Sequence, residues 1–75
     1  MNKNRRNQIR GIVAQIRMIK EQLEAIKSDE EFSYDSMPEN LQGSDRGIDS
    51  ENAIEDMENA LESLQDAEDS ISSIR

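Results

Sequence analysis

Arg46 is the residue whose type and setting suggest chemistry most directly. It is the only basic residue between Lys27 and the terminal Arg75, in a stretch otherwise rich in Asp and Glu. A guanidinium presents a planar fork of donors that fits phosphate or carboxylate oxygens. Neutral donors lie close by in the chain, and the ring of Tyr34 or Phe32 could stack on a nucleobase. The predicted ligand-binding residues are Arg46, Tyr34, Ser44, Gln42 and Asn40.

The same residues have a competing structural interpretation. Arg46 can pair with a neighbouring carboxylate, from Asp45, Asp49 or Glu39, and so hold a loop in place. The Tyr34 ring can pack inside that loop. Short motifs occur by chance, so the ligand hypothesis needs the surrounding structure before it can be preferred.

Most catalytic and metal chemistry is excluded by composition. The chain has no His and no Cys, so it lacks a proton shuttle near neutral pH, a thiolate nucleophile and the usual zinc ligands. Residues 45–49 do not match a calcium loop, which needs alternating oxygen ligands around its glycine. We therefore predict a protein that is not an enzyme and needs neither metal nor cofactor.

Two apolar repeats predict the elements that must position the candidate residues. Both have spacings that alternate between three and four, the repeat of an amphipathic helix with a coiled-coil seam. In the second repeat, alanines recur every seventh residue, at Ala53, Ala60 and Ala67, and leave room for a partner helix to approach. The predicted core or oligomer residues are Ile9, Ile12, Ile16, Ile19, Leu23, Ile26, Met57, Leu61, Leu64 and Ile71.

The predicted organisation is one domain, with a helix over about 4–35, a loop over about 36–49 and a helix over about 50–74. Ser36 and Glu39 have the spacing of a capping box, with a proline in the first turn after the cap. Gly43 suits a left-handed helix end, and Gly47 suits a further turn. Asp49 or Ser50 would then cap the last helix.

Charge is divided unequally between the two halves. Residues 1–27 carry a net charge of +5 and residues 28–75 carry −13. An antiparallel hairpin would place the basic start of the first helix beside the acidic end of the second, and correct the poor match of each helix to its own dipole. The predicted fold is an all-α antiparallel helical hairpin, with Arg5, Arg6 and Arg10 beside Asp66, Glu68 and Asp69.

Size predicts self-association. Only 15 of the 75 residues are Ile, Leu, Val or Phe, and a core this small is marginal without a disulfide, a metal or a second chain. We expect a helical-bundle homo-oligomer, a dimer or larger, in which hairpins pack either parallel or antiparallel.

Partners other than the chain itself are constrained by the net charge of −8. This charge argues against nucleic acid as a partner, although the acidic second helix could imitate DNA phosphates and cover a nuclease. No apolar stretch approaches the roughly 20 residues that a membrane span needs. Residues 1–20 do not have the pattern of a signal peptide, so we expect a cytoplasmic protein.

Residues 34–47 read Tyr-x-x-Met-Pro-Glu-Asn-Leu-Gln-Gly-Ser-x-Arg-Gly. This segment, between a basic and an acidic helix, resembles a motif in small uncharacterised proteins of Firmicute phages and prophages. The resemblance implies a phage accessory protein in the host cytoplasm. Our hypothesis is an anti-defence protein that sequesters a nucleotide-derived immune signal in an oligomer. The alternative is a protein-interaction inhibitor whose acidic helix binds a host or phage protein.

Overall fold

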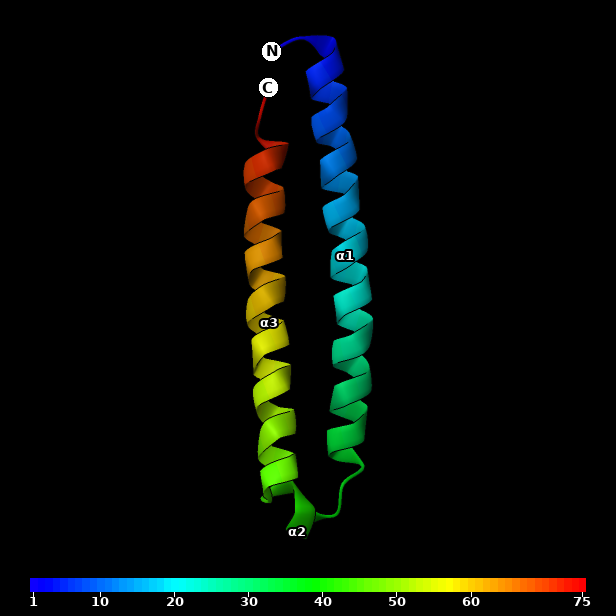
Figure 1. Ribbon diagram of the computed structural model, residues 1–75, viewed down its shortest axis with the longest axis vertical. Coiled ribbons are helices and arrows are strands. Elements are labelled where there is room, and N and C mark those ends of the chain that lie inside the picture. Colours follow the sequence, from blue (N-terminus) through cyan, green and yellow to red (C-terminus); the bar gives the residue numbers. More distant parts are fainter.

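A computed structural model describes all residues, 1–75, as two long antiparallel helices joined by one short helical turn. Helix α1 spans Lys3–Asp35, α2 spans Glu39–Gln42 and α3 spans Asp45–Ser72. Figure 1 shows α1 and α3 side by side, with both chain termini at one end and α2 at the other. The all-α hairpin predicted from the two apolar repeats is therefore confirmed. Neither of the long helices contains an apolar segment of the length that a membrane span needs.

The connection differs from the prediction because α3 begins at Asp45, whereas the sequence indicated a start near residue 50. Ser44 is its N-cap, so Gly47 lies inside the helix instead of in a turn before it. Ser36 is the C-cap of α1 and does not open a capping box, since α2 starts at Glu39 with Pro38 at its N-cap and no side-chain cap. Gly43 has φ −85°, an ordinary right-handed conformation.

Gly47 has a packing role that its place in the sequence did not reveal. It is buried, and a Cβ atom at this position would lie 2.0 Å from the backbone oxygen of Gln42. The first turn of α3 therefore packs directly against the backbone that ends α2. Only glycine permits this approach. Helix α3 therefore begins at Asp45 and includes residues that were expected to belong to the loop.

The seam between α1 and α3 leaves most apolar side chains partly in contact with solvent. Val13 is the only buried hydrophobic residue, and no side chain is fully buried. Three of the predicted core residues, Ile12, Ile19 and Ile26, remain exposed. The others are half-buried: Ile9, Ile16, Leu23, Met57, Leu61, Leu64 and Ile71.

Ion pairs between the helices follow the predicted antiparallel sense and include the predicted Glu68, but their basic partners differ from those predicted. Arg17 and Lys20 both bind Glu68, and Lys27 Nζ lies 3.9 Å from the Glu58 carboxylate. The three arginines expected to pair, at the start of α1, form no ion pair. Of these, Arg6 donates instead to the backbone oxygen of Met1, and Arg10 to the side chain of Asn7. Basic residues about two to five turns beyond Arg10 therefore make the contacts.

Candidate ligand-binding site

Three of the predicted ligand residues hold the chain reversal together. Gln42 Nε2 donates to the backbone oxygen of Tyr34 at 3.1 Å, and the Ser44 hydroxyl donates to the backbone oxygen of Leu41. The Tyr34 hydroxyl donates to Glu51 on α3, and this hydrogen bond raises the pKa of the phenol above its ordinary value. These three side chains are hydrogen-bonded within the chain, so they stabilise the chain reversal instead of facing a ligand.

Arg46 is the second residue of α3, and its side chain, unlike those of these three residues, makes no contact that holds the chain reversal. Its guanidinium makes no ion pair and no hydrogen bond, so no carboxylate binds it directly. It borders two open hollows at the loop end of the hairpin, of about 460 and 370 Å³, and both are also lined by Ser33 and Met37. Asn40 is exposed and lines neither hollow.

The smaller hollow brings one cation together with hydroxyls and a ring. It is lined by Phe32, Ser33, Ser36, Met37, Pro38, Leu41 and Arg46, and no acidic residue borders it. Phe32 is the most exposed large hydrophobic side chain, at 75%. The arrangement offers a charged fork and two hydroxyl groups beside the free face of an aromatic ring.

The larger hollow is different in charge, because Glu30 and Asp49 line it with Arg46. Glu30 accepts a hydrogen bond from Ser50 at 2.8 Å, and Ser50 is only 4% exposed. The carboxylates favour a group that donates hydrogen bonds, such as an amine or a hydroxyl. The two hollows together are thus suited to a ligand with an anionic part and a donor-rich part.

The ring and hydroxyls of the smaller hollow come from the last turn of α1 and its C-cap. Phe32 was predicted from the sequence as an alternative to Tyr34 for stacking, whereas Ser33 and Ser36 were not predicted to bind a ligand. Phe32 and Ser36 are separated by four residues and Ser33 and Ser36 by three, and on a helix such neighbours share a face. This spacing could have indicated from the sequence that the three side chains lie together. Their approach to Arg46 depends on the chain reversal through α2, which the helix repeat does not specify.

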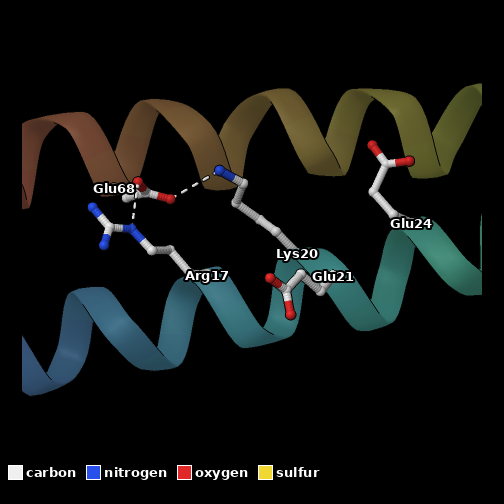
Figure 2. A pocket seen from close by; sticks show the side chains of 5 residues that line it. All are labelled: Arg17, Lys20, Glu21, Glu24 and Glu68. Carbon is white, nitrogen blue, oxygen red and sulfur yellow. Dashed lines mark hydrogen bonds and ion pairs between the residues drawn. The ribbon is translucent and has the colours of Figure 1, made fainter.

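A third hollow, of about 420 Å³, lies between the long helices and is shown in Figure 2. Arg17 Nε and Lys20 Nζ both point to Glu68, at 3.2 and 2.8 Å, and Glu21 and Glu24 stand at the rim. Both cations are bound to Glu68, and Glu21 and Glu24 line the same hollow, so its charge does not favour an incoming anion. We assign the cluster a structural role.

Glu68 should make the stability of the hairpin depend on pH. The hydrogen bond from Lys20, and then that from Arg17, hold the pKa of this carboxyl below its usual value. A group with a lowered folded-state pKa stabilises the fold above its unfolded pKa, and this contribution is lost as the pH falls through the folded value. We expect Glu68→Gln to flatten the decrease in unfolding free energy between pH 5 and 3, measured by urea denaturation.

The matched control is Glu62→Gln, which removes one charge from an exposed position on α3 that has no ion pair. This variant should keep the pH dependence of the native chain. Equal slopes for Glu68→Gln and the native protein would show that the cluster does not stabilise the hairpin.

No family model matches the chain, and neither a search of curated proteins nor a search of solved structures found a match.

Proposed function

We propose that this chain is a non-enzymatic binding protein of phage type that sequesters a nucleotide-derived immune signalling molecule and does so as a homo-oligomer. The observation that carries the proposal is the unpaired guanidinium of Arg46, which borders an acid-free hollow lined by Ser33, Ser36 and Phe32. The resemblance of residues 34–47 to phage proteins supports the biological setting.

Each part of a nucleotide has a counterpart at this site. A guanidinium can bind a phosphate through two parallel hydrogen bonds, which are stronger than those between neutral groups. Hydroxyl groups supply further donors, and an exposed aromatic ring can stack on a base. The hollow of about 370 Å³ is within the range of small-molecule sites, roughly 300–1,000 Å³.

Sequestration fits a small chain that lacks the commonest catalytic side chains. The absence of His and Cys from the sequence removes the commonest nucleophiles and proton shuttles. A protein of 75 residues can act by one-to-one capture if it is made in amounts that match its ligand. The site then needs affinity and does not need to stabilise a transition state.

Isothermal titration calorimetry with the full chain tests this function. The probes are a nucleoside monophosphate, a cyclic mononucleotide and a cyclic dinucleotide, each titrated into protein at high concentration. We expect at least one to bind, and Arg46→Ala to weaken that binding by at least about 30-fold, the effect of losing a two-point charged contact. Arg10→Ala removes the same charge at an exposed position on α1 and should leave the affinity unchanged.

Failure of all three probes to bind the native protein would reject the nucleotide hypothesis. Equal weakening by Arg46→Ala and Arg10→Ala would show that net charge, and not the Arg46 site, controls binding.

A second candidate function is supported by the outer side of α3. Glu55, Glu62 and Asp66 are exposed and form no ion pair, so they are free to contact the basic surface of another protein. A stoichiometric protein partner retained by Arg46→Ala and lost on neutralising these three acids together with Glu58 would favour inhibition by protein binding.

A further inference from the structure

Half of the circumference of α1 carries no charge over most of its length. Residues seven apart lie one above the other on a helix and form seven rows along it. Between Asn7 and Ser28 the charged residues occupy only three of these rows, which are adjacent: Arg10, Arg17, Lys20, Glu21, Glu24 and Lys27. The uncharged half has isoleucine at one row and glutamine at the adjacent row: Ile12, Ile19 and Ile26, then Gln8, Gln15 and Gln22. An exposed helix in a chain that is 35% charged would not keep half its surface uncharged without a partner.

Helix α3 does not provide that partner for the isoleucine row. Ile12, Ile19 and Ile26 are 45%, 48% and 58% exposed. On the opposite side of the seam, one row of α1 contacts one row of α3 through polar pairs: Lys20 with Gln65, Lys27 with Glu58 and Tyr34 with Glu51.

Because the helices are antiparallel, the rows on the other side of the seam share a face. On α1 this is the isoleucine row, and on α3 it is the alanine row. We call this surface the open apolar face: Ile12, Ile19 and Ile26 with Ala53, Ala60 and Ala67. The small alanines let a second pair of helices approach closely.

We propose that the open apolar face binds a second copy of this chain in antiparallel orientation, giving a two-fold symmetric four-helix bundle. The proposal specifies the oligomer in the proposed function but does not depend on the ligand. The hairpin measures 59 by 15 Å across its broad face, roughly 900 Å², against about 800 Å² buried per partner in a standard interface. A symmetric pair would bury the three isoleucines that one hairpin leaves exposed.

Charge at the ends of the face decides the orientation. The row beside the isoleucines is glutamine at three positions and becomes acidic only at Asp29, toward the loop. The row of α3 beside the alanines is likewise acidic toward the loop, at Asp49 and Asp56. It is neutral toward the termini, at Ser63 and Ser70. Arg5 continues the isoleucine row at the end where both termini lie.

Parallel packing would collect the acidic ends of both copies at one end of the bundle. Antiparallel packing separates them and brings Arg5 of each copy toward Asp29 and Asp56 of the other. Like charges held together at an interface are costly and opposite charges set its register. The charge distribution therefore favours the antiparallel pair.

Sedimentation equilibrium without nucleotide tests the interface. We expect twice the chain mass of 8.6 kDa for the native protein. Ile19→Glu should raise the dimer dissociation constant at least about 30-fold, because it places a charge at the centre of the face. Ala14→Glu adds the same charge at an exposed position on the charged half of α1 and should leave the constant unchanged.

A native chain that stays at 8.6 kDa at millimolar concentration would overturn the proposal. So would a dimer that Ile19→Glu and Ala14→Glu weaken equally. Ile12→Gln, which adds no charge, provides a second variant should Ile19→Glu fail to fold. It should weaken the dimer in the same direction.

A single spin label tests the orientation on the intact face, since the chain has no native cysteine. With the label on Gln8→Cys, an antiparallel pair centred near Ile19 separates the two labels by about 33 Å at 1.5 Å per residue. A parallel pair would place them within about 20 Å, because packed helix axes are about 8–10 Å apart. The short distance would overturn the antiparallel arrangement. Neither measurement uses a nucleotide, so failure here is distinguishable from failure of the ligand site.

Discussion

Replacing Gly47 with alanine is expected to lower the free energy of unfolding by about 3 kcal/mol, the upper part of the usual range for overpacking. The added Cβ would lie 2.0 Å from the oxygen and 2.5 Å from the carbonyl carbon of Gln42. These are backbone atoms, so no side-chain rotation relieves the contact. Either α2 must move away from α3 or the first turn of α3 must unwind. Urea denaturation followed by circular dichroism measures the loss.

The chain offers two matched controls at its other glycines. An alanine Cβ at Gly43 or Gly11 would meet no atom within 4 Å. Gly43→Ala should change stability little, since its φ of −85° suits alanine. Gly11→Ala lies in the interior of α1 and should stabilise the protein by about 1 kcal/mol. A Gly47→Ala variant as stable as Gly43→Ala would contradict the close contact between α2 and α3.

Ser50→Ala is expected to cost about 2 kcal/mol, the value of a hydrogen bond to a charged group. Ser50 is 4% exposed and donates to Glu30 Oε1 at 2.8 Å, which links α3 to α1 near the loop. The alanine variant leaves that carboxylate without its donor. Unfolding free energy from chemical denaturation provides the measurement.

Ser63→Ala is the control for the Ser50 substitution. Ser63 is exposed on the same helix and makes no hydrogen bond through its side chain. Its replacement should be slightly stabilising, because alanine has the higher helix propensity. If both alanine variants behave alike, the contact between Ser50 and Glu30 contributes nothing to stability.

The long helices and their antiparallel pairing were predictable because a repeat of three and four residues has one simple structural solution. The connection was not, because Gly47 acts through a tertiary contact. In the sequence a glycine after Asp45 and Arg46 is typical of a turn. In the structure it lies in α3, where its missing side chain accommodates the backbone of Gln42. Local preference and packing requirement point to different structures at the same residue.

The candidate site was predictable in part for a similar reason. Arg46 stood out because it is a lone cation among acids, and the structure leaves it unpaired. The sequence could not show that Tyr34 and Gln42 are occupied by contacts within the chain reversal. Nor could it show that Phe32 and Ser33 stand beside Arg46, since that proximity depends on the path through α2.

The position of both termini at one end of the hairpin has a mechanical consequence. A load applied between the termini pulls the helices apart sideways, so contacts break in succession instead of together. The Glu68 cluster, with partners 51 and 48 residues apart in sequence, opens early. The contacts between Ser50 and Glu30 and between Tyr34 and Glu51 span only 20 and 17 residues and open late. We expect refolding to run in the reverse order, because closing the shorter loops costs less entropy. The chain reversal would then form first and the contacts near the termini last.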